Sequence, residues 1–306
     1  MKIYNNLIIN KKHQDSVVAI GNFDGIHLGH QKVINQARQK AKKNRLPFGI
    51  ITFEPMPAMF FNKKLKNHRI NSLIQKKNQL KKLKVDFLII INFNKNFSQL
   101  SAEKFINKII FKKTKCKFLY VSKNFKFGFK RQGNIKTLKK FEKKYNFISI
   151  VTKPFKKNNK IISSTYIRKL LEKGFVHKVN KLLKKKWCIV GKVEKGRMMG
   201  KKIGFPTCNI DIKDYIIAKP GVYAVKTKIN NNKKFYKGIA NLGYRPTFNQ
   251  KVILLEVNIF NFYGNLYNKK LIIEFIKFIR EEKKFKGMDE LKNQIKKDLL
   301  KVKRIK

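Results

Sequence analysis

The sequence predicts an α/β chain of two domains, in which a parallel sheet with helices precedes a small antiparallel β-barrel with a terminal helix. The chain has 306 residues, which suits two domains of common size. In the first half, apolar runs alternate with segments of helical spacing, which is typical of a parallel sheet. In the second half, one strand-like run follows another before a last amphipathic helix.

The first half contains four apolar runs typical of buried strands, separated by segments with helical spacing. The expected strands are 17–20, 48–53, 87–91 and 118–121, and the expected helices are 30–43, 73–83 and 102–111. Residues 21–29 form the loop between the first strand and the first helix. Strands and helices in this alternation are joined by right-handed crossovers, so all four strands are expected to be parallel.

The second half begins near the lysine run 184–186, which divides the chain into expected domains 1–183 and 184–306. Its expected strands are 187–193, 221–229, 235–240, 252–260 and 271–279, joined by turn sequences rich in Asn and Gly. The expected terminal helix, 288–301, places Leu291, Ile295 and Leu299 on one face.

The chain is strongly basic, with 74 Lys and Arg against 17 Asp and Glu and a formal net charge of +57. Such a field attracts polyanions, so one interpretation is a nucleic-acid or anionic-membrane partner. The other interpretation is an AT-rich codon bias, since only nine of the basic residues are Arg and the lysines are spread from end to end. The even spread favours the second interpretation. Hydrophobic residues make up 42%, which excludes a disordered chain.

The cysteines and the apolar runs indicate a cellular setting. The chain has three cysteines, Cys116, Cys188 and Cys208. An odd number without a CxxC or Cys/His metal pattern is typical of reduced thiols. The first residues contain no apolar signal region, and no apolar run is long enough to span a membrane. We therefore expect a cytoplasmic protein with no membrane partner and no specific nucleic-acid partner, as a monomer or weak homo-oligomer.

The segment Gly21–His30 follows the first expected strand and leads into the first expected helix. Anions bind at such junctions because free backbone N–H groups and the helix dipole face the ligand. His27 and His30 are three residues apart, so both can reach one phosphate group, and Gly29 lets the backbone approach closely. The pair can stabilise charge on an α-phosphate while pyrophosphate leaves. The alternative is a pair of ordinary surface or capping histidines.

A second helix start follows at Ser163, Ser164 and Thr165, with Ser164 as the expected N-cap. Arg168 lies one turn into this helix, and its guanidinium can grip two phosphate oxygens. Taken alone, the segment is a capping motif with a solvated Arg. Together with the histidine pair, it predicts a second group of ligands for the same triphosphate.

A glycine-rich segment in the second half carries Gly196, Gly200 and Gly204, followed by Pro206-Thr207-Cys208-Asn209. Glycines allow main-chain amides to surround phosphates, and the segment is not a Walker A loop. Thr207 and Asn209 are two residues apart and therefore lie on one side of an extended segment. Their oxygens can bind Mg²⁺ together with phosphate oxygens. The alternative is an ordinary Gly-rich loop beside a strand.

A single carboxylate, Glu274, interrupts the apolar run 271–276. A buried carboxylate is costly unless it has a partner or a function. A carboxylate beside a bound hydroxyl can take its proton during phosphoryl transfer. The alternative is a Glu–Lys pair on the barrel surface.

These motifs together resemble the family of bacterial bifunctional riboflavin kinase/FMN adenylyltransferases (FAD synthetases), in that family's order and over nearly the whole chain. The first half is similar to its Rossmann-like nucleotidyltransferase domain through 21–30, 52–57, 124–128 and 162–168. The second half is similar to its riboflavin kinase domain through 191–209, 221–225, 240–247 and 278–285. The resemblance implies that ATP phosphorylates riboflavin to FMN, and that a second ATP adenylylates FMN to FAD with release of pyrophosphate.

The resemblance also implies roles for single residues. In the first half, His27, His30 and Arg168 are expected to be catalytic, and FMN is expected to contact Asn124, Phe125 and Phe127. The residues expected to bind ATP there are Gly21, Phe23, Asp24, Gly29, Ser163, Ser164 and Thr165.

In the second half, Thr207 and Asn209 are expected to hold Mg²⁺, and Glu274 is expected to take the proton of the riboflavin 5′-hydroxyl. ATP is expected to contact Gly196, Gly200, Gly204, Pro206 and Thr207. The chain departs from the family pattern at Met56, Lys126 and Tyr166, where His, Arg and Arg are common.

Two alternatives to a fully active bifunctional enzyme stay open. One is an enzyme in which only the kinase half is active, because the departures lie in the first half. The other is a basic nucleic-acid-binding protein that keeps a nucleotide-binding fold. A chain that had lost its enzymatic role would not be expected to keep His27, His30, Asp24 and Glu274, and all four are present.

Overall fold

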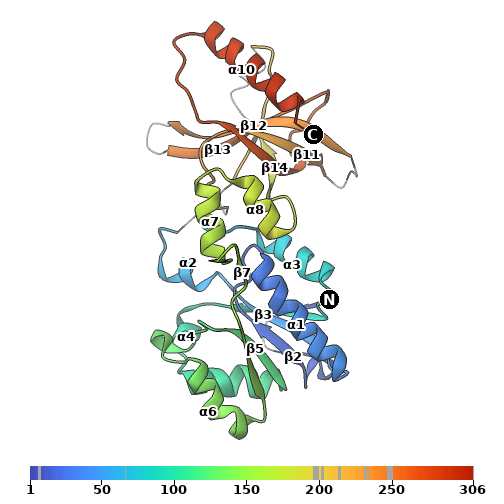
Figure 1. Ribbon diagram of the computed structural model, residues 1–306, viewed down its shortest axis with the longest axis vertical. Coiled ribbons are helices and arrows are strands. Elements are labelled where there is room, and N and C mark those ends of the chain that lie inside the picture. Colours follow the sequence, from blue (N-terminus) through green and yellow to red (C-terminus); the bar gives the residue numbers. More distant parts are fainter. Residues whose placement is uncertain are drawn as a thin grey trace. The chain divides into compact units, whose positions relative to one another are not determined.

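The structure is a computed structural model that describes residues 1–5, 8–65, 67–195, 200, 203–212, 215–230, 232, 234–246 and 251–305. The chain forms two compact units, one of residues Met1–Lys66 and Leu73–Ser163, the other of Asn67–Ser72 and Ser164–Lys306 (Figure 1). The helices between residues 164 and 183 belong to the second unit. The expected division between residues 183 and 184 stays a prediction about sequence domains.

The first unit is built on a six-stranded parallel sheet with the order β1-β4-β3-β2-β5-β6. The four predicted strands are present as β2, β3, β4 and β5, and β1 and β6 extend the sheet at its two edges. Their bounds are β1 Lys2–Tyr4, β2 Val17–Ile20, β3 Phe48–Glu54, β4 Phe87–Asn92, β5 Phe118–Ser122 and β6 Ile148–Thr152. The central strands are buried on both faces, which explains why their sequences are continuous apolar runs.

Helices cover both faces of this sheet. On one face, α1 (Leu28–Lys43) and α3 (Leu73–Lys82) bury Ile34 and Leu80 against the side chains of β2, β3 and β4. On the other face lie α5 (Ala102–Phe105), its continuation as the π-helix η2 (Ile106–Lys113), and α6 (Ile135–Tyr145). The shorter elements are η1 Lys11–His13, α2 Pro57–Phe61, α4 Lys95–Ser98, η3 Phe129–Arg131, β7 Lys156–Lys157 and β8 Lys160–Ile161.

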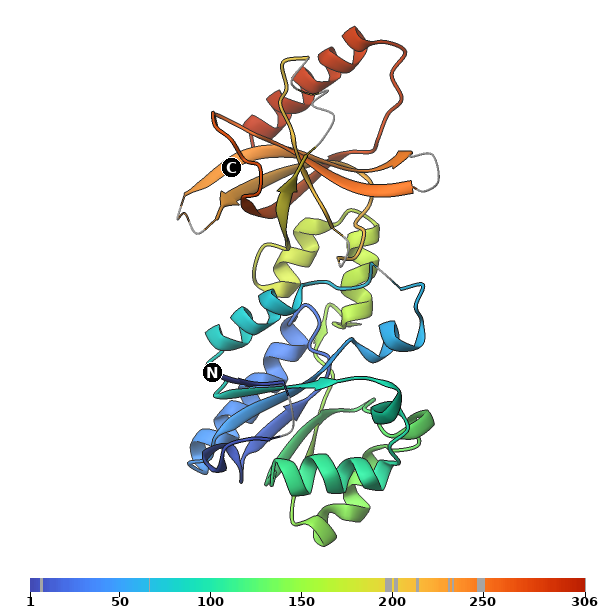
Figure 2. The same ribbon diagram turned by 180° about the vertical axis from the view of Figure 1, so that it is seen from behind.

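The second unit begins with α7 (Ser164–Glu172) and α8 (Val176–Leu183), and continues as a closed antiparallel barrel with the order β10-β13-β12-β11-β14-β9. Helix α10 (Met288–Lys303) lies across the outside of this barrel in both views (Figures 1 and 2). The strands are β9 Cys188–Glu194, β10 Cys208–Ile210, β11 Gly221–Ile229, β12 Phe235–Pro246, β13 Lys251–Ile259 and β14 Lys270–Arg280.

Several large aromatic side chains point to the inside of the barrel. Tyr223 and Phe275 fill the interior with ring centroids 5.0 Å apart, and Trp187 packs on Phe275 at 4.7 Å. The α/β fold class predicted from the sequence is therefore confirmed for both halves. Within the described ranges, no helix combines the length and the apolar character that crossing a membrane requires.

Candidate active sites

The loop between β2 and α1 has an unusual backbone. Phe23, Gly25 and Ile26 all have positive φ values, of 46°, 83° and 44°. For a β-branched residue such as Ile26 this conformation is strained, and its side chain is fully buried. The side-chain amide of Gln31 donates a hydrogen bond of 2.9 Å to the Ile26 carbonyl oxygen and holds this turn in place.

A buried lysine fixes the other end of the loop. Lys76 on α3 is only 1% exposed, and its Nζ donates to the carbonyl oxygen of Asn22 at 2.8 Å and to Thr52 Oγ1 at 3.4 Å. Thr52 Oγ1 donates to the same Asn22 oxygen at 3.2 Å. Lysine is almost never fully buried without such partners. Sequence analysis missed this residue, because its burial depends on a contact with the distant Asn22.

The two histidines lie together at the start of α1. The rings of His27 and His30 are stacked with centroids 3.8 Å apart, and Phe23 packs on His30 at 5.2 Å. His27 occupies the N-cap position but makes no side-chain capping hydrogen bond, so the structure gives no support to a capping role. A Cβ at Gly29 would lie 3.1 Å from the His27 ring, which explains the glycine between them.

The remaining predicted ATP ligands are placed as follows. Gly21 and Asp24 belong to the same loop, and Asp24 is 2% exposed. Ser163 ends the first unit, whereas Ser164 and Thr165 form the first turn of α7 in the second unit. Helix α7 includes Ser164, so the expected N-cap lies one position too late.

Arg168 follows one turn later in α7. Its Nε donates to the backbone oxygen of His68 at 2.8 Å, within the second unit. That bond orients the guanidinium from its Nε side. Joint action of the histidines and Arg168 on one nucleotide stays a prediction.

The predicted flavin-binding segment follows β5. Phe125 and Phe127 are stacked with centroids 5.3 Å apart and planes 19° from parallel. Phe127 is 7% exposed and exchanges two backbone hydrogen bonds with Gly133, so it forms the support of the segment. Asn124 is exposed, and Phe125 is half-buried. Of the three, Asn124 and Phe125 are therefore the side chains accessible to a ligand.

In the second unit, a row of side chains crosses five strands on the outside of the barrel. Asn209 is paired with Glu256, Glu256 with Asn241, Asn241 with Val222, and Val222 with Arg280. Directly opposite residues in antiparallel strands point to the same face. At about 4.8 Å per strand, the row is about 19 Å long.

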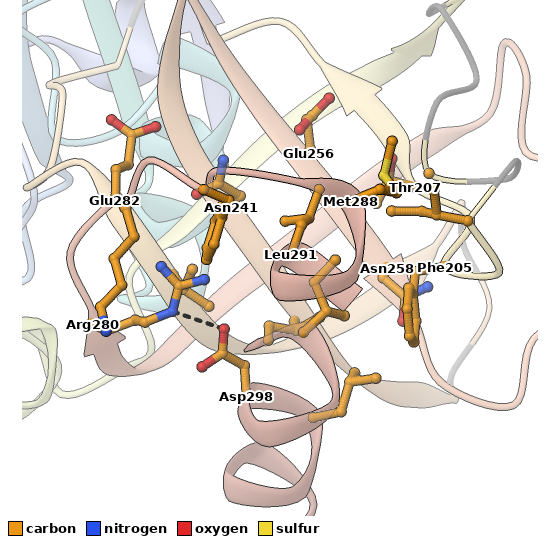
Figure 3. A pocket seen from close by; sticks show the side chains of 18 residues that line it. Phe205, Thr207, Asn241, Glu256, Asn258, Arg280, Glu282, Met288, Leu291 and Asp298 are labelled. Carbon is orange, nitrogen blue, oxygen red and sulfur yellow. Dashed lines mark hydrogen bonds and ion pairs between the residues drawn. The ribbon is translucent and has the colours of Figure 1, made fainter. Parts of the chain in front are cut away.

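Helix α10 closes a cavity of about 310 Å³ over this row (Figure 3). One end of the cavity is polar and is lined by Thr207, Glu256 and Asn258. The wall formed by α10 is apolar and consists of Met288, Leu291, Ile295 and Leu299. Other apolar lining residues are Ile203, Phe205, Val222, Ile239 and Phe285. Charged residues line the cavity as well, namely Arg280, Glu282, Lys283 and Asp298. Such a lining suits a ligand that has an apolar body and polar groups.

Of the glycine-rich segment, Gly200 lies against Phe205 and Thr207. The Phe205 N–H donates to the Gly200 oxygen at 2.8 Å, and a Cβ at Gly200 would lie 2.4 Å from the Phe205 oxygen and 3.1 Å from Thr207 Oγ1. Gly204 has a φ of +86°, and the Pro206 oxygen accepts a 2.6 Å bond from Asn258 Nδ2. Gly196, which was also predicted to contact ATP, lies outside the described residues.

The structure does not bring Glu274 to this cavity. Glu274 is paired with Lys226 on β11. Lys226 lies four residues from Val222, a member of the row, so Glu274 is about 13 Å from the row along the strand direction. Burial raises the pKa of Glu274, and the charges of Lys186, Lys226 and Lys228 oppose that shift. This environment fits the alternative of a surface Glu–Lys cluster. The carboxylate that lies between Asn209 and Asn241 at the polar end of the cavity is Glu256, which sequence analysis missed.

Burial also raises the pKa of two other ionisable groups at or near the cavity, Glu282 and Cys208. Glu282 lines the cavity, and burial raises its pKa. Burial also raises the pKa of the Cys208 thiol to about 12, so the residue between Thr207 and Asn209 is an inert, protonated thiol. Among the described residues, no group of three or more His, Cys, Asp or Glu could hold a metal ion.

Comparison with known proteins links both units to flavin enzymes. Residues 9–166 match the family model of FAD synthetase, and residues 183–306 match that of riboflavin kinase. The chain is 42% identical to the bifunctional riboflavin kinase/FMN adenylyltransferase of Buchnera aphidicola subsp. Schizaphis graminum, with 95% of this chain and 94% of that protein covered. The proteins of the same name from Haemophilus influenzae and Bacillus subtilis are 40% and 37% identical, with 95% of this chain and 94% and 92% of those proteins covered.

A solved structure from Streptococcus pneumoniae, described as a macrolide-efflux protein, matches with a TM-score of 0.87 and 29% identity over 99% of both chains. Its description differs from the names of the curated relatives. The two family models, however, cover both units and agree with those names. On these matches, the chain belongs to the family of bifunctional riboflavin kinase/FMN adenylyltransferases.

Proposed function

We propose that the barrel unit phosphorylates riboflavin and that the sheet unit, with residues of α7, adenylylates the resulting FMN. The observation that carries the kinase assignment is the cavity under α10, whose apolar wall suits an isoalloxazine ring and whose lining includes Thr207 and the carboxylate of Glu256. Family membership supports the same assignment.

In the kinase reaction, we assign the role of general base to Glu256 in place of Glu274. The carboxylate takes the proton of the riboflavin 5′-hydroxyl as that oxygen attacks the γ-phosphorus of ATP, and the bond to the bridging oxygen of ADP breaks. The support is its place in the row, between Asn209 and Asn241.

Thr207 and Asn209 are the residues we assign to Mg²⁺, since both offer neutral oxygens. Asn209 is paired with Glu256, and Thr207 lines the same cavity as Glu256. When bound, Mg²⁺ neutralises charge on the phosphates. Gly200 and Gly204 allow the backbone to pass close to the phosphate chain, and Pro206 orients Asn258.

In the adenylyl transfer, a phosphate oxygen of FMN attacks the α-phosphorus of ATP and pyrophosphate leaves. The stacked pair of His27 and His30 stabilises the charge on the α-phosphate, and Arg168 binds the triphosphate. Ser163, Ser164 and Thr165 donate hydroxyl hydrogen bonds to it. The loop between β2 and α1 is shaped by Gly21, Phe23, Asp24 and Gly29. In the segment after β5, Asn124 and Phe125 contact the flavin, and Phe127 stacks beneath Phe125.

The setting we propose is the cytoplasm, where Cys116, Cys188 and Cys208 stay reduced, as they are in the structure. The experiment that tests the proposed function is incubation of the purified protein with riboflavin, ATP and Mg²⁺, followed by separation of the fluorescent flavins. Addition of a nucleic acid to the same assay tests the competing interpretation of the charge. We expect flavin turnover that nucleic acid does not stimulate.

A further inference from the structure

Helix α10 is anchored unevenly on the barrel. The residues that it buries fully, Asp298 and Val302, lie in its last two turns. Leu291 and Ile295, which face the cavity from the first turns, are only half-buried. The helix is thus attached through its second half, and its first half forms one wall of the cavity.

Asp298 is a charged residue in an almost inaccessible place. Its side chain is 2% exposed, and both carboxylate oxygens have partners within the second unit. Oδ2 accepts a hydrogen bond of 2.8 Å from Arg280 Nε, and Oδ1 accepts one of 2.9 Å from Gln294 Nε2. A carboxylate is rarely so buried unless it is paired in this way.

Both members of this ion pair line the cavity, and Arg280 extends from it along the barrel. It is the last member, on β14, of the row that begins at Asn209, and its Nη1 donates to the Glu281 oxygen at 2.8 Å. Its guanidinium lies 5.8 Å from the ring centroid of Phe285, another lining residue. In Figure 3 the ion pair lies on the opposite side of the cavity from Thr207 and Phe205. The ion pair therefore contacts the part of the cavity that is remote from Thr207, where the phosphates are proposed to bind.

We propose that Asp298 is a positioning residue of the kinase reaction, which acts through Arg280 to fix how closely α10 approaches the barrel and thereby sets the affinity for riboflavin. This inference rests on the proposed function, in which the cavity binds riboflavin. Because Asp298 is remote from the phosphate end, it affects the binding of the flavin and not the transfer of the phosphoryl group.

The test compares Asp298→Asn, which keeps the shape and removes the charge, with Asp289→Asn. Asp289 lies in the first turn of the same helix and is exposed, so it is a matched control for loss of one negative charge. For D298N we expect the riboflavin KM to rise by about tenfold, with kcat and the ATP KM changed by less than about twofold, which is the pattern of lost ground-state binding. D289N is expected to match the wild type.

A second measurement asks whether Asp298 acts through Arg280. The double variant D298N/R280Q is expected to show no higher riboflavin KM than R280Q alone, since the two residues act as one unit. Additive effects, an unchanged riboflavin KM in D298N, or a loss confined to kcat would each overturn the inference. If D298N does not fold, Gln294→Leu removes the other partner of the carboxylate, and we expect a smaller rise of the riboflavin KM. An unchanged KM in Q294L would then overturn the inference.

These outcomes are separate from those of the proposed function. Absence of any riboflavin phosphorylation by the folded wild-type protein would contradict the proposed function itself. Normal phosphorylation by the wild type and D298N alike would contradict only the role of Asp298. FAD formation from supplied FMN, measured on the same samples, is expected to be unchanged in D298N and checks that the first unit is intact.

Discussion

Glu256 and Asn209 stand directly opposite each other in the ladder between β13 and β10, on the outside of the barrel. This pairing puts a carboxylate beside Asn209, and Thr207 lines the same cavity as Glu256. It is the geometric reason for proposing Glu256, and not Glu274, as the base of the kinase reaction.

The first prediction separates the two carboxylates. Glu256→Gln is expected to lower kcat for FMN formation by about 10²–10⁴-fold, the usual contribution of a general base. Glu274→Gln is the matched control, with the same chemical change on another strand of the same barrel, and is expected to keep near-normal activity. Steady-state phosphorylation of riboflavin measures both. An inactive E274Q beside an active E256Q would restore Glu274 as the base.

The second prediction concerns pH and Glu274. Burial raises its folded-state pKa, so above the ordinary Glu pKa the folded state binds more protons than the unfolded state. The free energy of unfolding contributed by this group therefore falls as pH rises from the unfolded pKa to the folded one. E274Q removes this pH-dependent contribution to the free energy of unfolding. Urea titrations at about pH 4 and about pH 7 are expected to show E274Q gaining stability relative to the wild type at the higher pH. A gain at the lower pH instead would contradict the assigned environment.

The third prediction tests the histidine pair. His30→Ala is expected to lower kcat for FAD formation from FMN by about 10²–10³-fold, the cost of losing one group that stabilises transition-state charge. His177→Ala, an exposed histidine on α8, serves as the control. FMN formation by H30A is expected to be normal. Loss of both activities in a folded H30A protein would refute the assignment of two separate sites.

The fourth prediction concerns the buried lysine. Lys76→Met keeps the length of the side chain and removes the donor that holds the Asn22 carbonyl. The loop between β2 and α1 therefore loses its fixed position. Small displacements of catalytic groups are costly, and we expect kcat/KM for FAD formation to fall by about tenfold or more. Lys81→Met, on the exposed side of the same helix, is expected to have no effect. Equal rates in K76M and K81M would show that the loop does not need this contact.

The sequence predicted the larger elements well for a physical reason. The strands β2, β3 and β4 are buried on both faces, so their apolar runs are continuous and easily recognised. The strands β1 and β10 have only three residues each, too few for a periodic pattern.

The sites were predicted less completely, because they depend on contacts between distant segments. Glu256 and Glu274 both lie in predicted strands among apolar neighbours, and alternation alone does not tell which outer face another element covers. The pairing of Glu256 with Asn209 and the docking of α10 decide it. Lys76 was missed for the same reason, since its burial depends on a loop more than fifty positions earlier in the chain. The histidine pair was found because three residues of spacing at a helix start already bring the rings together.

The most direct test of the central claim is a time course of the purified wild-type protein with riboflavin, ATP and Mg²⁺, in which fluorescent flavins are separated at each time. We expect FMN to form first and FAD to follow as FMN is consumed, with pyrophosphate released in step with FAD. A folded protein that yields neither FMN nor FAD would contradict the account.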